Sequence, residues 1–125
     1  SRNAALDAIE TAAGASPTLE IRTGAAPATC ATADSGTVLV TMALPADWLA
    51  AASGGTKAIL GTWQDLSADA AGTAAHFRIK QGATCHIQGS VTATGGGGDM
   101  TLDNVSIALA QQVTVTAFTL TAGGA

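Results

Sequence analysis

The sequence has no tyrosine, and only two phenylalanines, two tryptophans and two cysteines among its 125 residues. Two cysteines are too few for the disulfide framework typical of small secreted domains. Charge is scarce too, because charged residues make up 11% of the chain, against about 25% in an ordinary soluble domain. Five basic residues are dispersed among a chain of net charge -4, so there is no basic face of the kind that binds nucleic acid.

No apolar run approaches the length of a membrane-spanning helix, and the first residues lack the apolar core of a signal peptide, so we expect no membrane partner. A cleaved signal stays open, since the chain begins with Ser1. The length fits one domain. Alanine makes up about half of the hydrophobic residues and buries little apolar area, so a domain stable alone and one that depends on partners are both open.

The clearest pattern lies in residues 73–91, where apolar and polar residues alternate on both sides of Gln81 and Gly82. Such alternation around a short turn predicts a β-hairpin. The face expected toward the core carries Phe77, Ile79, Cys85 and Ile87. The face expected toward water or a partner carries His76, Arg78, Lys80, His86 and Gln88.

Shorter runs predict further strands, at residues 19–22, 37–44, 57–63, 99–102 and 112–120. A change of parity near Ala117 indicates a β-bulge in the last of them. Many short strands behind one leading helix are typical of an antiparallel β-sandwich of jelly-roll type. We therefore expect a mainly β fold in two parts, a helical arm at residues 1–14 and a β-sandwich domain at residues 15–125.

The predicted helix covers residues 2–13, where Leu6, Ile9 and Ala13 recur at helical spacing and Gly14 ends the pattern. A helix of about three turns is marginal in isolation, so it must dock on another surface. That surface is either its own β-domain or a neighbouring subunit.

Two further segments could lie at an interface. Residues 37–44 are apolar on both faces, which suits a central strand or one that faces another subunit. Residues 46–53 could form two helical turns before Gly54 and Gly55 stop them.

No residue pattern indicates catalysis or a metal. Cys30, His76, Cys85 and His86 supply the atoms of a Cys2His2 zinc site, but their spacing matches no common zinc pattern. Cys85 with a histidine and an aspartate has no local catalytic signature, and the glycine run at 95–98 is not followed by the lysine of a phosphate-binding loop. We predict no enzyme, no metal and no cofactor.

The cysteines and tryptophans each have two interpretations. Free, buried thiols are favoured for Cys30 and Cys85, with a single bridge as the alternative. Trp48 and Trp63 either pack in the core or anchor an interface. The candidates for partner contact are Leu6, Ile9, Trp48 and Leu49.

Several segments together resemble a family of small virion proteins of tailed bacteriophages. They read SRNAALDAIE, LEIRTGAAPA, GTVLVTMALP, DAAGTAAHFRI, GGGDMTLDNVSI and QQVTVTAFTLT. The resemblance implies a non-enzymatic structural protein at the capsid surface of the virion, assembled in the host cytoplasm. Its expected role is that of a cement or decoration protein that bridges subunits of the major capsid protein and forms homo-oligomers.

Two other roles stay open. One is a head domain of the neck, tail or a fibre that binds adjoining tail proteins or the host surface. The other is a bacterial surface or carbohydrate-binding module. That module would need an exposed aromatic side chain, and the available ones are Trp48, Trp63, Phe77 and Phe118.

Overall fold

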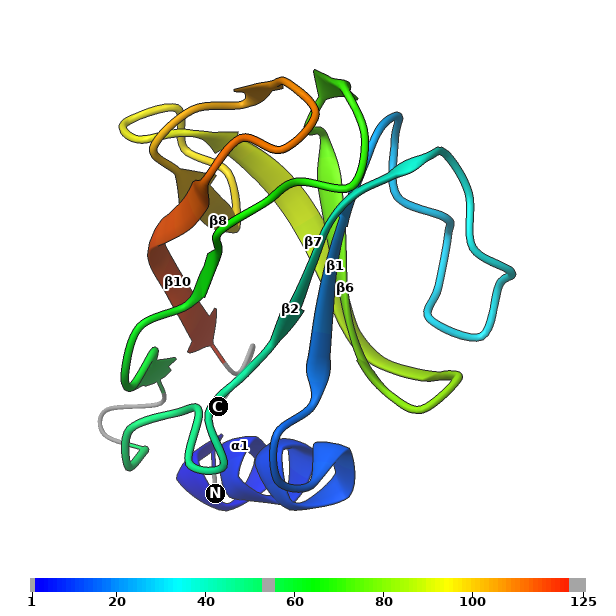
Figure 1. Ribbon diagram of the computed structural model, residues 1–125. Helices are drawn as coiled ribbons and strands as arrows, with labels where there is room; N and C mark the ends of the chain where they lie inside the picture. The colour runs from blue at the N-terminus through cyan, green and yellow to red at the C-terminus, as the bar shows by residue number, and fades with distance from the viewer. Residues whose placement is uncertain (1, 53–55, 122–125) are drawn as a thin grey trace.

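A computed structural model describes residues 2–52 and 56–121. In this part of the chain one helix, α1 (Arg2–Ala13), precedes ten strands (Figure 1). The strands are β1 (Thr18–Arg22), β2 (Val38–Ala43), β3 (Thr56–Ala58), β4 (Gln64–Asp65), β5 (Gly72–Thr73), β6 (His76–Gln81), β7 (Thr84–Ala93), β8 (Met100–Leu102), β9 (Ser106–Ile107) and β10 (Val113–Thr121). The mainly β composition and the leading helix confirm the coarse prediction.

The main sheet curls into a nearly closed barrel. Its strand order is β2-β1-β6-β7-β8-β10-β3, and β4 also pairs with β10. The segment that begins at β4 returns to β2, because the amide of Asp69 donates to the carbonyl of Leu39 (2.8 Å) and the amide of Thr41 donates to Oδ2 of Asp65 (3.3 Å). These bonds cover the free edge of β2, while β5 and β9 form a separate two-stranded ladder.

The sheet is mixed, which differs from the antiparallel sandwich expected from the sequence. Strands β7 and β8 pair in parallel, with Val91 opposite Met100. The glycine run at 95–98 makes this possible, because Gly95 and Gly97 adopt positive φ angles of 86° and 84°, which side chains with a Cβ rarely tolerate. The chain leaves β7, turns back within this short loop, turns a second time and continues beside the end of β7 in the same direction.

Helix α1 lies across one end of its own barrel (Figure 1). Its last residue, Ala13, is fully buried, and Ile9 packs against the core. The side chain of Gln81 donates to the carbonyl of Ala13 (2.7 Å), and Nε1 of Trp48 donates to the carbonyl of Gly14 (3.0 Å). Of the two docking surfaces considered for the helix, the structure shows the one on its own domain.

Four aromatic side chains form the centre of the core. Ring centroids lie 6.0 Å apart for Trp48 and Trp63, 5.7 Å for Trp63 and Phe118, and 5.3 Å for Phe77 and Phe118. Gly89 lies opposite Phe77 in the β6–β7 ladder, and a Cβ there would approach the Phe77 ring to 2.9 Å. The core interpretation of both tryptophans is therefore the one observed.

Other predicted elements are shorter or absent. Residues 46–52 are not helical, and the expected strand at 57–63 is reduced to β3 and an isolated bridge between Leu49 and Ile59. The predicted bulge in β10 is confirmed by a register shift between Val115 and Ala117. The β6–β7 hairpin is confirmed as well, with an unpredicted bulge between Ile79 and Lys80.

Candidate functional site

The most unusual site in the described chain is a group of charges on the outer face of β1 and β6, in which the basic side chains are buried. Glu20 and Arg22 project from β1, and Arg78 and Lys80 project from β6, which pairs with it. Asp34 joins them from residues 23–37, which connect β1 to β2 and have no helix or strand. We call Glu20, Arg22, Asp34, Arg78 and Lys80 the ion-pair cluster, and residues 23–37 the cover loop.

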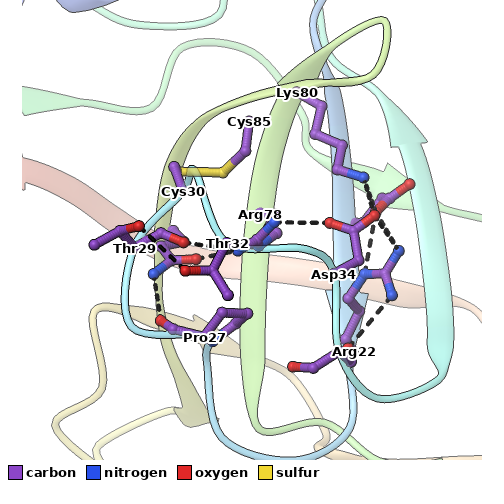
Figure 2. A network of polar contacts seen from close by, with 12 residues as sticks. Arg22, Pro27, Thr29, Cys30, Thr32, Asp34, Arg78, Lys80 and Cys85 are labelled. Carbon is purple, nitrogen blue, oxygen red and sulfur yellow. Dashed lines mark hydrogen bonds and ion pairs between the residues drawn. A yellow bond between two sulfur atoms is a disulfide. The ribbon is translucent and has the colours of Figure 1, made fainter.

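Asp34 is the centre of this cluster (Figure 2). Its Oδ1 accepts a hydrogen bond from Nη1 of Arg78 at 2.8 Å. Its Oδ2 accepts from Nζ of Lys80 at 2.5 Å and from Nη2 of Arg22 at 3.2 Å. Three of the five basic residues of the chain therefore converge on one carboxylate.

Glu20 supplies the second negative charge. Its Oε1 accepts from Nη2 and Nε of Arg22, at 2.8 and 3.1 Å, and lies 3.2 Å from Nζ of Lys80. The cluster therefore holds three positive and two negative charges. The other residues then carry a net charge of -5, because the whole chain carries -4 and the cluster +1.

The basic side chains of the cluster are buried, which corrects the prediction that the polar face of the hairpin meets water or a partner. Only 2% of Arg78, 7% of Lys80 and 8% of Arg22 is exposed. A buried charge is costly unless it is paired and hydrogen-bonded. The cover loop supplies both the burial and much of the pairing.

The cover loop is attached to the barrel along its length. The imidazole Nδ1 of His76, which is fully buried, lies 2.7 Å from the carbonyl oxygen of Gly24. The side-chain amide of Gln88 donates to the carbonyl of Pro27 (2.6 Å), and Nη2 of Arg78 donates to that of Thr29 (3.0 Å). The loop thus follows the polar face of the β6–β7 hairpin from end to end.

A disulfide between Cys30 and Cys85 adds a covalent attachment (Figure 2), so the favoured prediction of free thiols is wrong. The cause is the bulge between Ile79 and Lys80, which places Cys85 opposite Lys80 and not in the core. On this face Cys85 meets the cover loop, with a Cα–Cα distance of 5.2 Å to Cys30. The two cysteines are 55 residues apart in the sequence, and no local spacing indicates their proximity.

The ion-pair cluster affects the acidity of Asp34. The hydrogen bond from Lys80 is the largest cause that holds the pKa of Asp34 below its ordinary value of 3.8, and Arg78 and Arg22 act in the same direction. Desolvation opposes them because burial disfavours the charged carboxylate. Asp34 is therefore ionised at neutral pH.

The structure places the predicted partner-contact residues mainly inside the molecule. Trp48 is fully buried and Leu49 is 2% exposed, and both belong to the core. Trp48 lies against the end of helix α1, where its Nε1 donates to the carbonyl of Gly14, and Leu49 forms a bridge with Ile59. Ile9 is partly buried against the same core, and the side chain of Leu6 lies outside the described residues. Trp48 and Leu49 therefore offer no surface to a partner in this structure.

Large apolar side chains are exposed elsewhere. Among the residues whose exposure is described, these are Leu66 (69%), Leu109 (67%) and Leu60 (41%). Leu66 and Leu109 lie on two loops that hydrogen-bond to one another, since Ala68 pairs with Ala110 and Gln111. Sequence reasoning missed both leucines, although a large apolar residue inside a predicted loop is the signal that could have identified them.

Among the described residues, the remaining polar groups provide no second candidate site. A shallow pocket beside β8 and β10 is lined by Asp99, Thr101 and Phe118, but Asp99 already accepts bonds from the amide and hydroxyl of Ser90. Within residues 2–52 and 56–121 no group of three or more metal-ligating side chains could hold an ion. In the same residues no helix is long and apolar enough to cross a membrane.

Comparison with known proteins found no matching family, no similar curated protein and no similar solved structure.

Proposed function

We propose that this protein is a non-enzymatic structural component of a tailed-bacteriophage virion, and that it acts as a cement or decoration protein that bridges subunits of the major capsid protein. The proposal starts from the resemblance of the sequence to small virion proteins. A protein that binds the assembled shell and not the dissociated one stabilises the shell by mass action. Many weak contacts are sufficient, because the symmetry of the shell multiplies them.

The observation that carries the proposal is the exposure of Leu66 and Leu109. Each exposes about two thirds of its surface, more than any other large apolar side chain whose exposure is described. Both lie on neighbouring loops joined by backbone hydrogen bonds, so the fold holds them in place. Exposed large apolar residues on loops that hydrogen-bond to one another are features of a protein-binding surface.

The edge strands of the barrel, β2 and β3, are already hydrogen-bonded to other segments. This favours the loops that carry Leu66 and Leu109 as the contact surface. Strand β2 is covered by the hydrogen bonds from Asp69 and to Asp65, and β3 is covered by residues 48–50 through the bonds of Ala50 and Leu60. An edge that is already hydrogen-bonded does not add a strand from another chain. Partners would therefore approach the loops at the ends of the barrel.

The carbohydrate-binding alternative requires an exposed aromatic side chain, and the four candidates are buried. Trp48, Trp63, Phe77 and Phe118 are each at most 4% exposed. None of these rings is available to stack on a sugar. The neck, tail or fibre role remains as the competing outcome of the test.

The test is the stoichiometry of this protein in purified particles, measured by quantitative mass spectrometry against the major capsid protein. A cement protein is expected near one copy per capsid subunit, or one trimer per local three-fold axis. A ratio of a few per cent would instead favour the neck or tail, and absence from particles would overturn both roles.

The contact surface is tested separately. Leu66→Ser combined with Leu109→Ser should abolish incorporation into particles while leaving the free energy of unfolding nearly unchanged, because both side chains are exposed. Leu60→Ser, which changes a less exposed leucine outside the two paired loops, is the matched control and should not affect incorporation.

A further inference from the structure

Asp34 occupies the ion-pair cluster as a ligand occupies a binding site. The three cations that hold it come from the barrel: Arg22 from β1, Arg78 and Lys80 from β6. The carboxylate comes from the cover loop, which has no regular secondary structure. About a third of the Asp34 side chain is exposed, compared with 2% for Arg78. The receptor half of this contact therefore belongs to paired strands and is buried, and the ligand half lies at the surface.

The cations keep other partners that do not depend on Asp34. Nε of Arg78 donates to Oε1 of Gln88 (3.1 Å), and Arg22 forms two hydrogen bonds with Glu20. Their orientation would persist if Asp34 moved away. Three positive charges would then face the single carboxylate of Glu20, and this excess of positive charge would favour another anion. Arginine and lysine together suit carboxylate and phosphate oxygens.

The disulfide determines how strongly the Asp34 carboxylate competes with other anions for the three cations. Cys30 precedes Asp34 by four residues, and its partner Cys85 lies opposite Lys80. The bridge thus holds the carboxylate beside the cations at a high effective concentration. A dithiol reductant would transfer two electrons and two protons to the bridge, giving two cysteine thiols and leaving the reductant as its own disulfide. The cover loop would then be held by non-covalent contacts alone.

We propose that Arg22, Arg78 and Lys80 form an oxyanion-binding site, that the Asp34 carboxylate fills it while the Cys30–Cys85 disulfide is intact, and that a carboxylate or phosphate of another molecule replaces Asp34 once the disulfide is reduced. The site is independent of the virion role, and its test uses the isolated full chain. Failure of one proposal therefore leaves the other unaffected.

The test compares oxidised and reduced protein, titrated with inorganic phosphate, acetate or sodium chloride at matched ionic strength. The readouts are the Nε–H resonance of Arg78 in NMR spectra and the melting temperature. In the reduced protein, phosphate should shift the resonance saturably and raise the melting temperature, and chloride should do neither. The acetate arm shows whether a carboxylate is accepted as phosphate is. The oxidised protein should respond to no anion beyond the effect of ionic strength.

Three variants make the result decisive. Reduced Asp34→Ala should bind phosphate about tenfold more tightly than reduced wild type, because the internal competitor is gone. Lys80→Met in the same background should remove most of this gain. The double variant Cys30→Ser/Cys85→Ser should behave as the reduced protein without any reductant, which decides the matter if Asp34→Ala does not fold. An equal response to phosphate and chloride in both the double variant and the reduced wild type would overturn the proposal.

Discussion

Strand β6 separates two regions that are equally buried and held together by different forces. On one face, Phe77 and Ile79 are at most 1% exposed and pack into the aromatic core. On the other face, Arg78 and Lys80 are at most 7% exposed and belong to the ion-pair cluster. The apolar face is stabilised by removal of surface from water, and the polar face needs a partner for every charge. Burial alone therefore does not indicate how a surface is stabilised.

The two faces should also fail under different conditions. The aromatic core contains no ionisable group, so its stability should not depend on acid or reductant. The ion-pair cluster depends on one loop, one disulfide and the ionised carboxylate of Asp34. Four measurements can test this distinction.

The largest effect is expected from Phe77→Ala, which removes the ring that contacts Phe118 edge-on. The cavity should lower the free energy of unfolding by about 3–5 kcal/mol, measured by urea denaturation. Phe77→Leu is the control and should lose less, because it leaves a smaller cavity. If Phe77→Ala lowered the free energy of unfolding no more than a substitution at an exposed position does, the aromatic core would not be the main source of stability.

The next effect is expected from Cys30→Ser combined with Cys85→Ser. Without the bridge the unfolded chain gains freedom, and the free energy of unfolding should fall by about 2–4 kcal/mol. The near-ultraviolet circular dichroism of the tryptophans should stay unchanged, since the aromatic core lies on the opposite face of β6. A collapse of that signal would mean that the two regions do not behave separately.

Asp34→Asn should have a smaller effect, a loss of about 1–2 kcal/mol, because hydrogen bonds to charged groups are lost at a partly exposed position. Chemical denaturation of the oxidised protein measures it. Asp47→Asn, at an exposed aspartate outside the cluster, is the matched control and should change stability by less than about 0.5 kcal/mol. Equal effects of the two substitutions would contradict the central role of Asp34.

The smallest expected effect is a dependence of stability on acid. The pKa of Asp34 is lower in the folded protein than its ordinary value of 3.8, so the stabilisation is fully present above that value. It should be lost as the pH falls through the lower pKa of the folded state. The difference in unfolding free energy between wild type and Asp34→Asn should therefore shrink below about pH 4. If this difference in unfolding free energy stayed constant down to pH 2, the result would contradict the predicted dependence on Asp34.

The local sequence pattern predicted the structure correctly where neighbouring residues decide it. Alternation identified the β6–β7 hairpin, and the change of parity near Ala117 identified the bulge of β10, because side chains on a strand alternate between two faces. The helix at residues 2–13 and its end at Gly14 followed from spacing and capping in the same way.

The local sequence pattern failed to predict burial and pairing where a segment distant in the sequence covers a surface. Polar residues on one face of the hairpin predicted a face toward water or a partner, but the cover loop of the same chain buries Arg78 and Lys80 and supplies Asp34. The pairing of Cys30 with Cys85 was missed for the same reason, since the bulge that turns Cys85 toward the loop leaves no trace in the alternation.

The mainly β character of the protein, its leading helix and its hairpin could be predicted from the sequence, since these features depend on the periodicity and turn propensity of adjacent residues. Tertiary structure decided that the sheet is a mixed, nearly closed barrel, that α1 and Trp48 belong to the same core, and that three cations share one carboxylate. The physical reason is range: hydrogen bonding and side-chain alternation act over a few residues, whereas burial and ion pairing join segments that only the complete fold brings together.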